Sequence, residues 1–314
     1  MTINLFAPSG IRRLFALFLF LIIRIAVFAQ STAGNQIVKP YSDEAFNAVQ
    51  EFFRYDKNLP LQAKTLSTED RGSYILEKFV FTTSNRSRVP GLLAIPKSGK
   101  PNYPCMILIH SGTGRKEDWW AEVGWIRGKS FTEKLLQSGY AVLAIDADGH
   151  GERAMNYDYV PLTSLAYETK EIYSFTKILT QSTIDHRRAY DYLKTKTSID
   201  SSRIGVMGYS LGGMISTYLC TQLPNLKVAV LCASGKEVSF CSPAVFPLHF
   251  APRIKDIPVL LLDGKDDTLF PASQVEDFGK ILKTKYKLIF YESGHLLPVK
   301  YLDDAYEWIS MYLK

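Results

Sequence analysis

The middle of the chain contains a glycine-flanked serine between two apolar segments, and this feature constrains the fold most strongly. Residues 204–207 form a continuous apolar run, which predicts a buried strand, and residues 214–219 carry apolar side chains at helical spacing. Between them, residues 208–212 read Gly-Tyr-Ser-Leu-Gly. In a G-x-S-x-G segment the serine lies on a sharp strand-to-helix turn with its hydroxyl exposed, because the glycines remove side chains that would collide there. We therefore expect a strand, a tight turn and a helix, with Ser210 as a candidate nucleophile.

A glycine-rich turn whose serine caps the following helix is the alternative interpretation of this segment. Short motifs occur by chance, so the surrounding pattern has to decide. Here both the strand pattern before Ser210 and the helix pattern after it are present, which favours the nucleophile. The N–H groups at the start of the helix would also face any negative charge that forms beside Ser210.

The chain has 314 residues, enough for one large domain or two small ones. Hydrophobic residues make up 46% and charged residues 22%, a globular balance that allows a sizeable core. The formal net charge is +6, but three of the positive charges (Arg12, Arg13 and Arg24) precede Ala33, where there is no acidic residue. The remaining positive charge is small and scattered, so the sequence does not indicate nucleic-acid binding.

The N-terminus has the pattern of an export signal. Arg12 and Arg13 provide a positive region, residues 14–23 are an unbroken apolar run, and small residues near positions 29 and 33 suit cleavage. We therefore interpret residues 1–33 as a signal peptide and expect a periplasmic or secreted protein with no membrane association after cleavage. An uncleaved N-terminal membrane anchor is the alternative, although the apolar run is short for a membrane span.

The four cysteines are Cys105, Cys220, Cys232 and Cys241. Three of them fall inside apolar strand or helix patterns, which is typical of buried thiols. An oxidising compartment would permit a disulfide, and Cys232 with Cys241 is the pair to check. No cysteine spacing indicates metal ligands.

Strand and helix patterns alternate along the chain. Continuous apolar runs are typical of strands buried on both faces of a parallel sheet. The expected strands are residues 74–82, 89–95, 105–110, 141–145, 204–207, 228–232, 258–262 and 287–291. The predicted fold class is α/β, with a mostly parallel central sheet of about eight strands and helices on both faces.

Two capping-box patterns predict where helices begin. Residues 130–133 read Ser-Phe-Thr-Glu, and we expect a helix from there to Gly139. Residues 182–185 read Ser-Thr-Ile-Asp and predict a second helix that ends near Lys194. Further helices are expected after the central serine and over residues 273–282 and 302–313.

The main domain is expected to cover residues 71–314. Residues 34–70 form an N-terminal extension with a short helical pattern at 46–53, which we expect on the outside of the domain. Two long aromatic segments without a strand pattern, residues 153–181 and 234–256, interrupt the domain. Connections of this length are usually functional, so both are interpreted as lid-like insertions that shape a pocket.

A serine nucleophile needs a base that takes its proton, and the base needs an acid that orients it. There are five histidines, and His295 follows the last expected strand and the acidic candidates. The chain order Ser, Asp, His is the one expected on a sheet of this kind. Because reactive groups collect beyond the carboxyl ends of parallel strands, we expect His295 beside Ser210 as the base.

Two adjacent carboxylates, Asp266 and Asp267, are candidates for the acid. Neighbouring side chains in a turn point in different directions, so only one of them should contact His295. This pattern alone leaves both open. Asp263, at the end of the preceding strand, is interpreted as a residue that caps the strand end or the turn.

The chain resembles the α/β-hydrolase superfamily, and within it the dienelactone-hydrolase-like and acetyl-xylan-esterase-like branch. The resemblance rests on the G-x-S-x-G segment with its downstream Asp and His. Three further segments support the branch: residues 89–96, 148–152 and 200–204. The resemblance extends from about residue 70 to residue 314. In this superfamily the acid commonly stands in a G-x-x-D-x-x-V-P context. That pattern falls on Asp267, with Phe270 where Val is usual and Asp266 as the fallback.

The resemblance also implies an oxyanion hole built from two backbone N–H groups. One would be that of Leu211, the residue after the serine, and the other would come from the loop after His110. The usual sequence there is His-Gly, whereas this chain has His110, Ser111 and Gly112. The donor is therefore Ser111 or Gly112, and we favour Gly112. His110 itself is interpreted as a residue that holds the loop.

Dienelactone hydrolase proper uses a cysteine nucleophile, and Ser210 in its place points to ester chemistry. We therefore expect a serine hydrolase that cleaves a small-molecule or carbohydrate ester through an acyl-enzyme, as a carboxylesterase or a carbohydrate deacetylase does. A peptidase of the same fold and an inert binding protein are the alternatives. No cofactor, metal or nucleic acid is expected, and the oligomeric state stays open.

Overall fold

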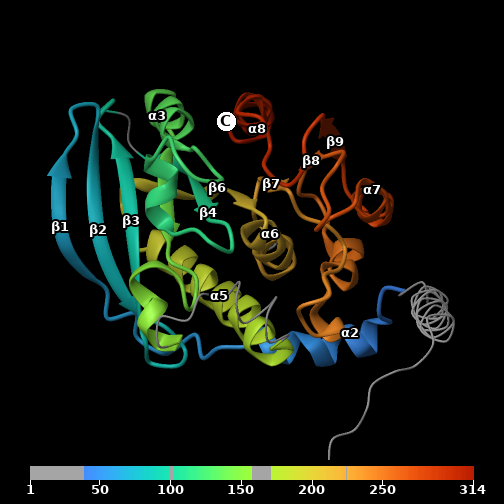
Figure 1. Cartoon of the computed structure of the whole chain (residues 1–314). Coiled ribbons are helices and arrows are strands. Elements are labelled where there is room, and N and C mark those ends of the chain that lie inside the picture. Colours follow the sequence, from blue (N-terminus) through green and yellow to red (C-terminus); the bar gives the residue numbers. More distant parts are fainter. Residues whose placement is uncertain (1–38, 100–101, 158–170, 224) are drawn as a thin grey trace, which may run out of the picture. The chain divides into compact units, whose positions relative to one another are not determined.

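The computed structural model describes residues 39–99, 102–157, 171–223 and 225–314. The predicted signal peptide, residues 1–33, lies outside these ranges. Within them, nine strands form one sheet in the order β1-β2-β3-β5-β4-β6-β7-β8-β9 (Figure 1). The strands are β1 (Lys64–Asp70), β2 (Tyr74–Thr82), β3 (Arg88–Pro96), β4 (Tyr103–Ile109), β5 (Ala141–Ile145), β6 (Ile199–Tyr209), β7 (Val228–Cys232), β8 (Val259–Gly264) and β9 (Tyr286–Tyr291).

The sheet is antiparallel at one side and parallel elsewhere. Strands β1, β2, β3 and β5 pair antiparallel in turn. All the remaining pairs, from β5 through β4, β6, β7 and β8 to β9, are parallel. The carboxyl ends of β4, β6, β8 and β9 therefore meet at one edge of the sheet. The predicted α/β fold with a mostly parallel sheet is confirmed.

One strand, β1, was not expected from the sequence. All seven of its residues are exposed, so no apolar alternation marks it. It forms because its backbone pairs antiparallel with β2, from Lys64 opposite Val80 to Asp70 opposite Ile75. Its charged side chains suit an edge strand that faces water.

Helices cover both faces of the sheet. They are α2 (Asp43–Gln50), α3 (Lys129–Gln137), α5 (Ile172–Leu193), α6 (Leu211–Gln222), α7 (Ala272–Ile281) and α8 (Lys300–Tyr312). Because successive side chains of a strand point to opposite faces, β4 contributes to two cores. Ile107 and Ile109 belong to a first hydrophobic cluster, and Met106 and Leu108 to a second.

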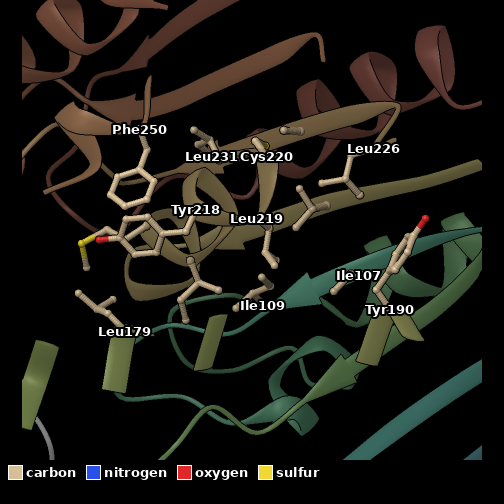
Figure 2. Close-up of a cluster of buried hydrophobic side chains, with 14 of the residues drawn as sticks. Ile107, Ile109, Leu179, Tyr190, Tyr218, Leu219, Cys220, Leu226, Leu231 and Phe250 are labelled. Atoms are coloured by element: carbon tan, nitrogen blue, oxygen red, sulfur yellow. The ribbon is translucent and has the colours of Figure 1, made fainter. Parts of the chain in front are cut away.

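The first cluster lies between the sheet and helices α5 and α6. Figure 2 shows Ile109 of β4 near Leu219 of α6, and Ile107 of β4 near Tyr190 of α5. On the opposite face, α3 and α8 cover the second cluster, which contains Leu135 and Ile309. The strand that precedes Ser210, β6, lies between the same two cores, because Val206 belongs to the first cluster and Met207 to the second. The turn after β6 therefore has a rigid base.

Of the two helix starts that the capping boxes predicted, the first is correct to within one residue and the second is wrong. Helix α3 begins at Lys129, and α5 begins at Ile172, ten residues before Ser182. Ser182 lies fully buried inside α5, and its hydroxyl accepts a hydrogen bond from the Asp148 N–H at 2.9 Å. Asp185 forms an ion pair with Arg153 at 2.6 Å instead of folding back on the helix. The same spacing of residue types therefore serves contacts in the middle of a helix.

The described parts of the two segments interpreted as lid-like insertions form helices and contribute to the core. Residues 172–181 are the first part of α5, and residues 158–170 lie outside the described ranges. The second segment contains the short 3-10 helices η4 (Pro243–Val245), η5 (Pro247–His249) and η6 (Ala251–Arg253). Val245 and Phe250 from this segment are fully buried in the first core.

The N-terminal extension also contributes to that core. Helix α2 and the 3-10 turn η1 (Glu51–Phe53) follow the expected helical pattern at 46–53. Phe53 is fully buried, with its ring 5.3 Å from the rings of Tyr218 and Phe250. This residue is part of the core, although we expected the extension on the outside of the domain.

All four cysteines are buried and free, so Cys232 and Cys241 are not bonded to each other. In the described part of the chain, we found no helix that has both the length and the apolar character to cross a membrane.

Candidate active site

Ser210 stands at the turn between β6 and α6 in a backbone conformation that side chains rarely adopt. Its φ is 55° and its ψ is −110°. A residue held in such a region costs about 1–3 kcal/mol, so the surrounding structure has to enforce it. The Ser210 N–H donates to the Cys232 carbonyl at 2.8 Å, and the Ser210 carbonyl accepts from the Met214 N–H at 3.1 Å. These bonds fix the turn to β7 and to the first turn of α6.

The two glycines of the motif allow a very close approach of backbones. A Cβ at position 208 would lie 2.0 Å from the Gly212 carbonyl oxygen, and one at position 212 would lie 2.4 Å from the Ile109 carbonyl oxygen. Such contacts are impossible for any side chain. The start of α6 is thereby pressed against the end of β4, next to the loop that follows it.

Ser210, His295 and Asp267 are joined by a chain of hydrogen bonds. His295 Nε2 lies 2.9 Å from Ser210 Oγ, and His295 Nδ1 lies 2.7 Å from Asp267 Oδ2. The other oxygen of Asp267 accepts from the N–H groups of Leu269 and Phe270 at 2.8 and 3.1 Å. Burial alone would raise the pKa of Asp267, but the bonds to His295 and to the two backbone N–H groups hold that pKa below its ordinary value.

The structure brings Asp267, and not Asp266, to the histidine. Asp267 is buried, whereas Asp266 is exposed. Asp263 caps the strand end, as expected: its carboxylate accepts from the Gly264 N–H at 2.7 Å and from the Ser234 N–H at 3.1 Å. Burial, together with the negative charge of nearby Asp267, raises the pKa of Asp263 to about 8.

The loop after β4 is held by the buried His110. The Ala147 N–H donates to His110 Nε2 at 3.0 Å, so Nδ1 carries the proton and donates to the Ser111 carbonyl at 2.8 Å. Burial lowers the pKa of His110 well below its ordinary value, which keeps the ring neutral. Gly112 follows beside the first residue of α6: a Cβ at position 112 would lie 3.7 Å from that of Leu211.

A cavity of about 400 Å³ opens beside the Ser210 hydroxyl. It is lined by residues 111–113, Trp125, Ser210, residues 268–269 and His295. The Trp125 ring lies 5.5 Å from the His295 ring and is 39% exposed. The volume is at the small end of ligand sites. Among the described residues, no group of three or more His, Cys, Asp or Glu side chains could hold a metal ion.

Two contributors to the site carried no sequence signal. Tyr209 occupies a position of the motif that any residue can fill, yet its hydroxyl reaches the turn that carries His295. Trp125 lies outside every expected strand and helix. Each joins the site through a contact across the fold, so only the tertiary structure reveals it.

A model of the dienelactone hydrolase family matches residues 89–300. The chain belongs to this family. The matched region includes Ser210, Asp267 and His295, the three residues joined by hydrogen bonds at the site. A related protein is the putative hydrolase YtaP of Bacillus subtilis (strain 168), which is 24% identical to this family member over 286 residues. The alignment covers 81% of this chain and 93% of YtaP.

Solved structures share the fold of this family member. An acetyl xylan esterase from Paenibacillus sp. R4 superposes with a TM-score of 0.67 at 18% identity, covering 88% of this chain and 96% of the other. A cold-adapted esterase from an Arctic intertidal metagenomic library gives 0.63 at 21% identity, covering 79% and 98%. These similarities confirm the predicted α/β-hydrolase fold.

Proposed function

We propose that this dienelactone hydrolase family protein is a serine hydrolase that cleaves carboxylic esters through an acyl-enzyme. The observation that carries the proposal is the hydrogen-bond chain from Ser210 Oγ through His295 to Asp267. A serine, a histidine and a buried carboxylate in this order supply a nucleophile, a general base and the group that orients the base. The solved acetyl xylan esterase and esterase of the same fold support ester chemistry.

In the proposed reaction, Ser210 Oγ attacks the ester carbonyl while His295 Nε2 takes the serine proton. Asp267 stabilises the imidazolium that forms. The backbone N–H groups of Leu211 and Gly112 are the proposed donors to the oxyanion of the tetrahedral intermediate. His295 then gives the proton to the leaving alcohol. A water molecule, activated by the same histidine, hydrolyses the acyl-enzyme and frees Ser210.

The proposed substrates are small-molecule or carbohydrate esters with a short acyl group. The small cavity beside Ser210 supports a short acyl chain, and the exposed Trp125 at its edge offers an aromatic surface to a sugar or an aromatic alcohol. A panel of nitrophenyl esters of increasing chain length tests this assignment. We expect turnover to fall as the acyl chain lengthens beyond a few carbons.

The decisive variant for the function is Ser210→Ala, with Ser202→Ala on the same strand as the matched control. Ser202 is exposed and lies away from the described cavity. We expect Ser210→Ala to lose essentially all turnover of nitrophenyl acetate, by ~10⁴-fold or more, and Ser202→Ala to keep it. Full turnover by Ser210→Ala would contradict the proposal. Cleavage of peptide nitroanilides with no ester turnover would instead indicate a peptidase.

We also propose that residues 1–33 direct export and are removed. The support is the sequence alone: paired arginines, an apolar run and small residues near positions 29 and 33. N-terminal sequencing of the protein recovered from the periplasm or the medium tests this. We expect a mature chain that begins near residue 30 or 34.

A further inference from the structure

A second buried histidine, His150, contacts the loop that lines the cavity. It follows β5 in the chain, is only 6% exposed and does not itself line the cavity. Its Nε2 lies 2.9 Å from the Gly112 carbonyl oxygen. Its ring is also 5.0 Å from that of His110, which holds the Ser111 carbonyl. Two adjacent carbonyls of one short loop are thus each bound by a histidine.

A hydrogen bond to a backbone carbonyl also fixes the direction of the next residue's N–H group. In a trans peptide the C=O and the following N–H point in opposite directions, because the unit is planar. The His150 bond to the Gly112 carbonyl therefore sets the direction of the Thr113 N–H, and the His110 bond to the Ser111 carbonyl sets that of the Gly112 N–H. Neither of these N–H groups has a hydrogen-bond partner among the described residues. Both belong to residues that line the cavity.

We propose that His150 is a positioning residue for residues 111–113, the loop that carries the proposed oxyanion donor Gly112. The His150 Nε2–H holds the Gly112 carbonyl and so keeps the N–H side of this loop turned toward the cavity. This inference rests on the proposed ester hydrolysis at Ser210. It adds the Thr113 N–H to the Gly112 N–H as a donor that the loop presents. It also assigns a role to a residue of the 148–152 segment beyond the support which that segment gives to the family resemblance.

The tautomer of His150 decides which of two neighbouring carbonyls its ring can hold. His150 Nδ1 lies 2.9 Å from the Asp148 carbonyl oxygen, so both ring nitrogens face atoms that only accept. Burial lowers the pKa of His150, against the opposing effect of the two carbonyls and of the Asp146 and Asp148 carboxylates. A neutral ring has one N–H and can hold only one of the two carbonyls. The inference requires that this N–H be on Nε2.

The test uses two amide side chains that each mimic one ring nitrogen. In His150→Gln the amide nitrogen stands where Nε2 was, and in His150→Asn it stands nearer to Nδ1. We expect the Gln variant to keep kcat close to that of the wild type. The Asn and Leu variants should lose about 10²-fold in kcat with little change in KM, the cost of a misplaced catalytic contact. Equal kcat for the Gln and Asn variants, or full kcat for Leu, would overturn the inference.

A measurement on the wild type removes any dependence on the folding of the variants. Nitrogen-15 NMR of histidine-labelled protein reports which ring nitrogen of His150 carries the proton. We expect a protonated Nε2, and a ring protonated only on Nδ1 would contradict the inference. Failure of the proposed function is distinguishable, because the wild type would then hydrolyse no ester, whereas failure of this inference leaves wild-type turnover intact.

Discussion

The Tyr209 hydroxyl donates a hydrogen bond to the His295 carbonyl at 2.6 Å. The same oxygen accepts from the Leu297 N–H at 3.0 Å. Tyr209 is fully buried, and burial raises the pKa of its hydroxyl, which therefore stays protonated. The residue next to the proposed nucleophile thus fixes the turn that carries the proposed base. The distance between Ser210 and His295 depends on this link as well as on their own hydrogen bond.

Replacing Tyr209 with Phe should loosen that turn. The change leaves a partly buried carbonyl and a buried N–H without their partner, which costs about 1–3 kcal/mol in unfolding free energy. We expect kcat for nitrophenyl acetate to fall by up to about 10²-fold with KM nearly unchanged, because the histidine is misplaced and not removed. Tyr286→Phe, at a tyrosine that is 40% exposed, is the control. Unchanged kcat in Tyr209→Phe would show that the link is dispensable.

The two adjacent carboxylates give a matched pair of variants. Asp267→Asn removes the charge that orients and stabilises His295 and should lower kcat by ~10⁴-fold. Asp266→Asn alters an exposed side chain that lies outside the hydrogen-bond chain, and we expect activity close to that of the wild type. Steady-state kinetics on purified protein compare the two. A larger loss in Asp266→Asn than in Asp267→Asn would reverse the assignment of the acid.

Asp263 should make stability depend on pH. Its carboxyl has a pKa near 8 in the folded protein and about 4 in an unfolded chain. Between these values the folded state holds a proton that the unfolded state has lost, so this group makes the fold less stable as pH rises through the window. Asp263→Asn removes the effect. We expect the Tm of the variant relative to the wild type to rise between about pH 4 and pH 8 and to level off above that.

Thermal unfolding at a series of pH values checks this prediction. Titrating groups that do not interact with Asp263 act equally on both proteins, so the difference in Tm reports Asp263 together with its coupling to Asp267. A difference that stays constant across the series would show that the carboxyl is ionised throughout.

The N-terminal extension should contribute to stability through one side chain. Phe53→Ala removes a fully buried ring that packs against Tyr218 and Phe250 and should lower the unfolding free energy by about 3–5 kcal/mol. Its neighbour Phe52 is 57% exposed, so Phe52→Ala is the control and should change little. Urea unfolding of both variants makes the comparison. Equal effects would mean that the extension does not belong to the core.

The sequence predicted the buried strands well, for a physical reason. Strands such as β5 and β7 lie inside the sheet and are buried on both faces. Their side chains are therefore apolar at every position, which makes a continuous apolar run in the sequence. Ser210 stands between two such constraints, the apolar strand and the helix pattern. The edge strand β1 has no apolar pattern, because every residue in it is exposed to water.

The remaining features depend on contacts that are distant in the chain. Residue pattern left Asp266 and Asp267 open because the choice is made by the fold, through a turn that directs one carboxylate to His295. The contact of His150 with Gly112 spans 38 positions, and that of Tyr209 with His295 spans 86. The start of α5 was missed because Ser182 matches a capping pattern while serving a buried tertiary contact.

The central claim, a reactive serine activated by His295 and Asp267, is tested most directly by covalent labelling. A fluorophosphonate probe reacts with an activated serine, and mass spectrometry of the digested protein locates the adduct. We expect one adduct, on the peptide that contains Ser210, with labelling lost in Ser210→Ala and strongly slowed in His295→Ala. An unlabelled wild type, or an adduct on a different residue, would contradict the account.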